Sequence, residues 1–318
     1  MAFPSGSVSY WLRRRFGISE VRREKFVLTM NRLKEITNSV VHHRMGGIGF
    51  AILGFFVTMA FIAPFLPIPP PEHSFLDSQG NQLQYLQPSW EHPFGTDQMG
   101  RDILSRVIWG SRVSLLVGFL ASVIAGVLGT AVGLVSGFSG GWHDEVLMRI
   151  NDILLSLPWL ALLIVLAQIL GGHLSLDVII LTIGLTSWNF TARVVRAQVL
   201  TVKERVFVER AKASGASNAT ILRKHIFPNV FPLVFANTIL TVAVAILSEA
   251  TLAFLGKVDV GTLSWGVVLH EAEASGAALN GGWAWIVMPG LSLVIVILDF
   301  SQLGYALDEI LNPKLRER

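Results

Sequence analysis

Cysteine is absent from the 318 residues, and charged residues make up only 15% of them. The first absence excludes disulfide bonds and thiolate chemistry. The charged fraction is well below the roughly 25% of an average soluble domain. Because 52% of the residues are hydrophobic and the mean hydropathy is +0.57, the chain is predicted to be an all-α polytopic membrane protein.

A nucleotide-binding loop is also missing. Such a loop reads G-x-x-x-x-G-K-[ST], but the nearest approach, Gly256-Lys257, has Thr251 and Val258 at the other two required positions. No catalytic set is visible, and His270–Glu273 lacks the His-Glu-x-x-His spacing of zinc proteases. The chain is therefore predicted to bind no ATP, metal or other cofactor and not to be an enzyme.

Six long apolar runs are present, and a helix needs about 20 apolar residues to cross a bilayer core. The runs cover residues 45–66, 107–138, 152–170, 176–190, 232–255 and 285–305. Pro64 and Pro67 are expected to end the first run, and Pro158 is expected to kink the third. The second run has small residues at helical spacing, which allow close helix approach in lipid. These residues are Gly118, Gly126, Gly129 and Gly133.

The polar segments divide the chain further. They predict a basic N-terminal tail (1–45), a first span (46–66), a Pro-rich loop (67–106), a transmembrane core (107–305) and a short C-terminal tail (306–318). The core is expected to carry the remaining spans and one long polar interruption.

Lys and Arg are unevenly distributed over these segments. Of the 25, 21 lie in the N-terminal tail, the 138–149 and 190–230 segments and the C-terminal tail, and four lie on the opposite side. The positive-inside rule then places both termini in the cytoplasm. A basic tail beside a span commonly sets the orientation of the protein in the membrane and contacts anionic membrane lipid. Nucleic acid is therefore not an expected partner.

The polar interruption at residues 204–229 predicts two short helices. The first covers residues 206–214 and ends at Gly215, which suits a left-handed residue. Asn218 is expected to cap the second helix, and Pro228 is expected to close the unit. Two short amphipathic helices held at the end of a span would form a protruding unit that a soluble partner can grip.

The long loop contains His92-Pro93-Phe94-Gly95-Thr96-Asp97-Gln98-Met99-Gly100-Arg101-Asp102. Pro93 and Gly95 predict a turn. The charged side chains of Asp97, Arg101 and Asp102 are expected to pair among themselves.

Two of these segments carry a resemblance. Glu209, Arg210, Ala211 and Gly215 resemble the EAA loop of ABC importer permeases, although Arg210 replaces the usual Ala. The 92–102 segment resembles the second-permease type of the dipeptide/oligopeptide/nickel branch of that family. The resemblance covers roughly residues 43–317 and implies a type I ABC importer fold with six transmembrane helices, forming half of the pore for short peptides.

The resemblance also implies a place in the inner or plasma membrane of a prokaryote, together with partners and roles. A homologous second permease, two ABC ATPase subunits that hold ATP and Mg, and an extracytoplasmic substrate-binding protein are expected. ATPase coupling falls on Glu209, Arg210, Ala211, Gly215, Ala216, Ile221, His225 and Pro228. Contact with the binding protein, or bracing of the outer gate, falls on Gly95, Thr96, Asp97, Gly100, Arg101 and Asp102.

Two ionisable residues, Glu249 and Asp299, lie within predicted spans, where they are costly and point to a specific role. Glu249 is expected to accept hydrogen bonds that brace the fifth span. Asp299 is expected to face the bundle interior and to pair with a cation of the partner subunit.

Several alternatives remain at this stage. The cargo is open between peptides, nickel, glutathione and oligosaccharides, and a nickel site at His270–Glu273 is one interpretation of that loop. A membrane scaffold without transport function does not explain the protruding unit. An ion-coupled secondary transporter usually shows internal repeats and more spans, and we find no repeat here.

Overall fold

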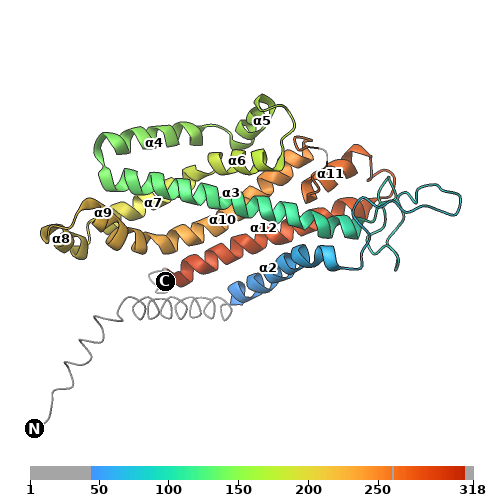
Figure 1. Cartoon of the computed structure of the whole chain (residues 1–318), viewed down its shortest axis with the longest axis horizontal. Coiled ribbons are helices and arrows are strands. Elements are labelled where there is room, and N and C mark those ends of the chain that lie inside the picture. Colours follow the sequence, from blue (N-terminus) through green and yellow to red (C-terminus); the bar gives the residue numbers. More distant parts are fainter. Residues whose placement is uncertain (1–43, 260, 312–318) are drawn as a thin grey trace, which may run out of the picture.

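The computed structural model describes residues 44–259 and 261–311 (Figure 1). The predicted tail residues 1–43 and 312–318 lie outside the described residues. The described helices are α2 (Arg44–Ile62), η1 (Ala63–Phe65), α3 (Ile103–Ser139), α4 (Gly141–Ser156), α5 (Trp159–Ile169), α6 (Leu176–Thr186), α7 (Trp188–Lys203), α8 (Val206–Ala213), α9 (Asn218–Ile221), η2 (Leu222–Ile226), α10 (Phe227–Phe254), α11 (Trp265–Ala274) and α12 (Trp283–Leu311).

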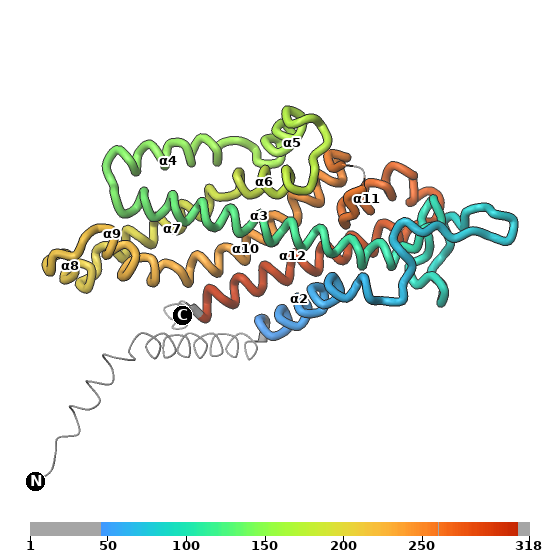
Figure 2. Tube along the Cα trace, in the orientation of Figure 1, coloured from blue at the N-terminus to red at the C-terminus, as the bar shows by residue number. Residues whose placement is uncertain are grey.

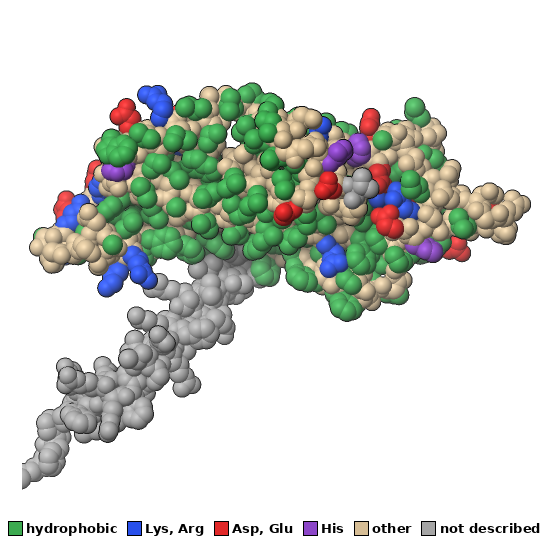
Figure 3. All heavy atoms as spheres, turned by 45° about the horizontal axis from the view of Figure 1, so that its top comes forward, with side chains coloured by type: hydrophobic (Ala, Val, Ile, Leu, Met, Phe, Trp, Pro, Cys, Tyr) green, Lys and Arg blue, Asp and Glu red, His purple; other side chains and the backbone are tan. Residues whose placement is uncertain are grey.

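The long helices form a membrane bundle. In the described part of the chain, five helical segments are long and apolar enough to cross a membrane, and the bent pair α4–α5 makes six if it is counted as one span. Figure 2 shows α3, α10 and α12 side by side along the long axis, with the 66–102 loop and the α8–α9 unit at opposite ends. Hydrophobic side chains cover the middle of the face seen in Figure 3, and charged ones gather toward its two ends. The predicted all-α membrane fold is confirmed.

The third apolar run differs from its prediction. Instead of one kinked span, α4 and α5 meet at 91°. Leu157 between them has an extended backbone, with φ −82° and ψ 135°, because the residue before a proline, here Pro158, is forced out of the helical region. Most of the 138–149 segment, expected as a loop, belongs to the ends of α3 and α4.

The fourth helix also extends beyond its predicted end near residue 190, because α7 continues to Lys203. Acidic side chains of α4 neutralise the arginines on the polar face of α7. Arg196 donates two hydrogen bonds to the Asp144 carboxylate, both at 2.6 Å, and Arg193 pairs with Asp152. Charged residues that hydropathy assigned to a loop therefore lie on a helix that packs against its neighbours.

Three glycines of α3 lie where α7 approaches most closely, whereas Gly118 and Gly126 face side chains of α10. A Cβ at Gly129 would lie 2.6 Å from the carbonyl oxygen of Trp188, and one at Gly133 would lie 2.6 Å from that of Ala192. Gly137 continues the same face, with its Cβ position 3.0 Å from the carbonyl oxygen of Arg196. The four-residue spacing of these glycines on α3 matches the spacing of the three carbonyl groups on α7. The backbones of the two helices are therefore in direct contact. The predicted close approach is confirmed.

The short helix α11 closes the bundle at the loop end. The Ser264 hydroxyl caps it by accepting the Val267 N–H at 3.3 Å. Trp265 is fully buried, and its indole N–H donates to the carbonyl oxygen of Val107 at 2.8 Å. These contacts fix α11 against α3, which places Glu271 over the first turn of α3.

Candidate functional site

The loop of residues 66–102 is folded by tight glycine turns. Gly95 and Gly100 have φ of 78° and 69°, a region that residues with a side chain rarely adopt. A Cβ at Gly95 would lie 2.1 Å from the carbonyl oxygen of Leu86. Only glycine fits there, so the predicted turn is confirmed and its chain path is specified by sequence.

Asp97 organises the turn from inside. Its Oδ1 accepts the backbone N–H groups of Met99 at 2.8 Å and Arg101 at 2.9 Å. Next to it, the Thr96 hydroxyl accepts the Leu86 N–H at 3.0 Å and donates to the carbonyl oxygen of Leu83. Asp97 therefore holds the turn together by accepting backbone hydrogen bonds, in addition to any pairing of its charge.

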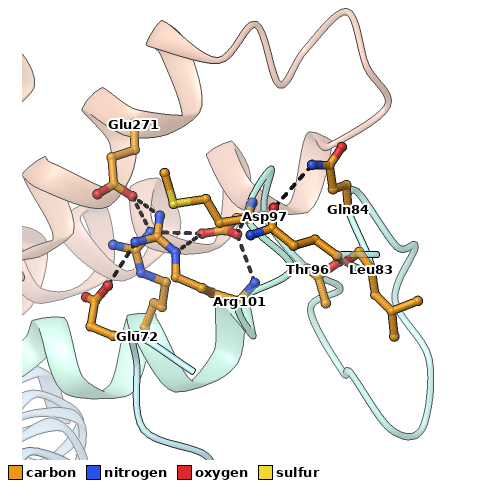
Figure 4. Close-up of polar contacts among 10 residues, drawn as sticks. Glu72, Leu83, Gln84, Thr96, Asp97, Arg101 and Glu271 are labelled. Atoms are coloured by element: carbon orange, nitrogen blue, oxygen red, sulfur yellow. Dashed lines mark hydrogen bonds and ion pairs between the residues drawn. The ribbon is translucent and has the colours of Figure 1, made fainter. Parts of the chain in front are cut away.

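A buried charge cluster surrounds Asp97 (Figure 4). Its Oδ2 lies 2.6 Å from Arg101 Nε and 3.2 Å from Arg106 Nη1. Arg101 also reaches Glu271 at 2.7 Å and Glu72 at 3.0 Å, and Arg106 pairs with Glu271. The side chains of Asp97 and Arg106 are 0% and 1% exposed. The cluster joins the loop, the start of α3 and α11 into one unit.

Opposite charges in the cluster shift the pKa of Arg101 and the pKa of Glu271. Burial by itself lowers the pKa of Arg101, but the Asp97 and Glu271 carboxylates more than offset this and raise it above its ordinary value. Burial by itself raises the pKa of Glu271, but Arg106 and then Arg101 outweigh burial and lower it. Each buried charge is therefore stabilised by an opposite one, as burial of ions requires.

The lowered pKa of Glu271 predicts an acid-sensitive contact between the loop and α11. A carboxyl whose folded pKa lies below its ordinary value of 4.5 contributes stability above that pH, and the contribution is lost as pH falls through the folded pKa. The midpoint temperature of thermal unfolding of the purified protein should be insensitive to pH near 6 and should decrease below about pH 4. Glu271→Gln should lower the midpoint near pH 6 and flatten the acid shift. An acid shift of equal size in both proteins would contradict the assignment.

Asp102 does not join this cluster, contrary to the predicted pairing among Asp97, Arg101 and Asp102. It is the N-cap of α3, because its Oδ1 accepts the Ser105 N–H at 2.8 Å. Its Oδ2 lies 3.0 Å from His92 Nδ1. Asp102 pairs outside the cluster because it occupies the N-cap position of α3, where a helix N-terminus attracts a carboxylate.

All six loop residues predicted to contact a gate or a binding protein are buried. Their side chains meet the interior of the loop and α11, and the exposed surface is formed by other residues, such as Trp90. The sequence did not point to Glu72, Arg106 or Glu271 as their partners. Glu271 lies 170 and 165 residues from the arginines it binds, and no local spacing signals such a contact.

The α8–α9 unit at the other end has its own core. Val208, Ile221 and Ile226 are fully buried and pack with valines of α7 and α10. Ile221 is therefore a core residue, and His225 is half-buried. The predicted Glu209, Arg210, Gly215 and Pro228 are exposed, and Ala211 and Ala216 are half-buried. Exposed apolar side chains accompany them at Val206 (59%) and Phe207 (41%).

The prediction that Pro228 closes this unit is wrong. Residues Asn218–Phe254 form one continuous helical segment, and Pro228 lies inside it, in the first turn of α10. The preceding residues Leu222–Ile226 form a π-helical turn. Ser217, not Asn218, caps the segment by accepting the Thr220 N–H at 3.3 Å. Gly215 has φ of 78°, so the predicted left-handed stop is confirmed.

A cavity of about 1460 Å³ runs along α3 and α10. It reaches from Glu72 beside the charge cluster to Phe227 beside the α8–α9 unit. Most of its lining is apolar, and Glu72 and Arg112 are the two charged residues among the described lining. The cavity therefore extends from one end of the bundle toward the other.

Comparison with known proteins assigns the chain to a family. Residues 129–317 match the family described as binding-protein-dependent transport system inner membrane component. The chain belongs to this family. The permease is 37% identical to the dipeptide transport system permease protein DppC of Bacillus subtilis (strain 168), over 84% of this chain and 81% of that protein. It is 34% identical to DppC of Alkalihalophilus pseudofirmus, over 89% and 90% of the two chains.

The fold of the permease is also similar to a solved one. A chain of the MetNI methionine ABC transporter, in an inward-facing conformation, superposes with a TM-score of 0.51 at 18% identity, over 64% of this chain and 97% of that chain. The type I importer fold predicted above is therefore confirmed. The chain is a multi-pass transport subunit of the inner membrane, and it is not an enzyme.

The two intramembrane carboxylates of the permease are both buried. Glu249 Oε2 accepts the Ser114 hydroxyl at 3.1 Å, which joins α10 to α3 in the way its sequence position suggested. Asp299 has no hydrogen-bond partner for either oxygen in the described part of the chain. It faces α2 of its own chain, where a Cβ at Gly49 would lie 3.0 Å from its Oδ1. This geometry does not support the predicted pairing with a cation of the partner subunit.

The His270–Glu273 run forms no metal site in this arrangement. His270 Nδ1 lies 2.8 Å from the carbonyl oxygen of Phe254, and Glu271 is bound by the two arginines. Among the residues described, no three His, Cys, Asp or Glu side chains are grouped to hold a metal ion. The geometry therefore gives no support to a nickel site here.

Proposed function

We propose that this chain forms one half of the pathway of an ATP-driven importer of short peptides. A homologous second permease forms the other half. The dipeptide transport names of its relatives support the cargo class. The cavity supports a shared pathway, because lining residues such as Phe119 and Val127 remain 60% and 64% exposed. Apolar side chains exposed on a membrane helix are covered by lipid or by a neighbouring helix, and the second permease is proposed to cover these.

We further propose that the α8–α9 unit receives one of the two ATPase subunits of the complex, which hold ATP and Mg. The exposed surface of this unit combines charged Glu209 and Arg210 with apolar Val206 and Phe207. A protruding surface of this composition suits a soluble protein partner. The positive charge of the neighbouring segments supports a cytoplasmic location for this end and for both termini.

The opposite end then faces an extracytoplasmic substrate-binding protein. The buried charge cluster is proposed to brace the outer mouth of the pathway and to hold the loop in one shape. Direct contact with the binding protein falls on the exposed tip, which carries the fully exposed Trp90. This assignment divides the loop into a rigid base, centred on Asp97, and a contacting tip.

The continuous segment Asn218–Phe254 supplies the coupling. It begins in the α8–α9 unit and ends beyond Glu249 near the loop end. A helix transmits displacement along its axis with little loss, so movement of the ATPase subunits is proposed to tilt α10 against α3. That tilt opens the cavity to one side of the membrane and closes it to the other.

The experiment that tests the function is ATP hydrolysis by the purified complex in lipid, with its binding protein. Di- to pentapeptides, glutathione, oligosaccharides and nickel chelates are offered separately. Stimulation by short peptides supports the proposed cargo, and stimulation by another class names a different one. If no ATPase copurifies with the chain, the importer proposal fails.

Gly215 provides a test of the coupling step. A β-branched residue is strained at a φ of 78°, so Gly215→Val should change the angle between α8 and the following helix. We expect peptide uptake to fall at least about tenfold while ATP hydrolysis continues, since about 1–3 kcal/mol of strain is relieved by moving the helices. Gly215→Asn is the matched control, because asparagine tolerates this conformation. Normal uptake by the valine variant would contradict the coupling role.

A further inference from the structure

Arg112 stands out among the cations at the loop end. Arg101 and Arg106 bind carboxylates, and Lys257 donates to Gln168 Oε1 at 3.2 Å. Arg112 has no hydrogen-bonded or salt-bridged partner in the described part of the chain, and its guanidinium carbon lies 5.2 Å from the centre of the Trp109 ring. Among the described residues, it is the cation of this group that has neither a carboxylate nor a hydrogen-bond acceptor as a partner.

The position of Arg112 is unusual for an uncompensated charge. It lies nine residues after Ile103 in α3, about 14 Å along the helix axis, within a segment long and apolar enough to span the membrane. Its side chain lines the 1460 Å³ cavity. Charged residues within spans face an aqueous pathway or a partner of opposite charge.

The surroundings of Arg112 are those of a binding group. Trp109 holds the guanidinium by a cation–π contact, which leaves its N–H groups free to donate. The rest of the cavity lining is largely apolar, and Glu72, the other charged lining residue, is bound to Arg101 at 3.0 Å. An apolar pocket with one oriented charged group is typical of sites that fix the orientation of a small ligand.

We propose that Arg112 binds the C-terminal carboxylate of the peptide as it enters the cavity. The guanidinium fork matches a carboxylate in a two-point contact. The apolar walls accept side chains of varied shape without selecting among them. This inference rests on the proposed function, and it adds the group by which the pathway itself recognises its cargo.

The test compares Arg112→Gln and Arg112→Lys with wild type in the complete reconstituted complex. Initial uptake rates are measured for a short alanyl peptide and for its C-terminal amide, chosen as a pair that wild type imports in both forms. The affinity of the binding protein for each peptide is measured separately and used to match occupancy. Lys257→Gln is the matched control, since it removes one positive charge at the same end outside the cavity lining.

We expect Arg112→Gln to lower uptake of the free acid on the order of tenfold, the usual effect of losing a hydrogen bond to a charged group. Uptake of the amide should be unchanged, Arg112→Lys should be intermediate, and Lys257→Gln should match wild type. Loss of complex assembly, or an equal fall for acid and amide, would overturn the inference and assign Arg112 to the partner permease. Unchanged uptake of both would also overturn it. If wild type imports no short peptide in either form, so that no such pair exists, the proposed cargo itself fails.

Discussion

Asp97→Asn is expected to prevent stable folding of the loop end and to abolish uptake. The substitution keeps the shape of the side chain but removes the charge that faces Arg101 and Arg106. Both guanidinium groups are nearly fully buried, and breaking a buried charge pair costs about 3–5 kcal/mol. This is a large part of the total stability of about 5–15 kcal/mol of a typical protein. Thermal unfolding of the purified protein and uptake by the reconstituted complex measure the effect.

Asp77→Asn is the matched control in the same loop. The Asp77 Oδ1 accepts the backbone N–H groups of Gln79 and Asn81, both at 2.8 Å, so its turn resembles that of Asp97. It makes no salt bridge among the described residues, and it is half-buried. The Asp77 variant should keep near-wild-type stability and uptake. Equal losses in both variants would show that turn formation, and not the buried charge, makes Asp97 necessary.

The double substitution Gly129→Val, Gly133→Val is expected to remove most of the folded protein from the membrane. Each new Cβ would lie 2.6 Å from a carbonyl oxygen of α7, so α3 and α7 must separate. Overpacking costs about 1–3 kcal/mol for each site, and the pair should approach the whole margin of stability. Uptake should fall in proportion to the folded protein. Size-exclusion chromatography of the membrane extract and a thermal unfolding curve give the folded fraction.

Gly54→Val is the control for a valine in a membrane helix. Gly54 lies in α2, and nothing is found within 4 Å of its Cβ position. Valine is also a better helix former than glycine, so this variant should remain folded. A double variant as stable as the Gly54 variant would contradict the tight contact between α3 and α7.

Five of the six predicted spans and the close packing of α3 could be predicted from sequence because both depend on local composition. A run of about 20 apolar residues has few alternatives to a membrane helix. Glycines spaced by four residues necessarily share one helix face. The length of α7 could not be predicted in this way. Its arginines reduce hydropathy, but Asp144 and Asp152 of α4 neutralise them in the folded protein.

The candidate sites divide in the same way. Gly95 and Gly215 were recognisable because a left-handed backbone leaves a local signal in the sequence. The role of Asp102 was misassigned because the exact first residue of α3 was unknown, and a helix cap depends on that position. The end of the α8–α9 unit was also misplaced. A proline can begin a helix as well as end one, and only the observed backbone distinguishes the two.

The sequence by itself determined the class of protein, its membrane helices and the family, because hydropathy and short motifs are properties of neighbouring residues. The tertiary structure alone decided that Glu271 binds Arg101 and Arg106, that Asp299 faces α2, and that Arg112 lines the cavity. These contacts join residues far apart in the chain, and their free energy depends on burial. Burial is set only when all the helices have packed together.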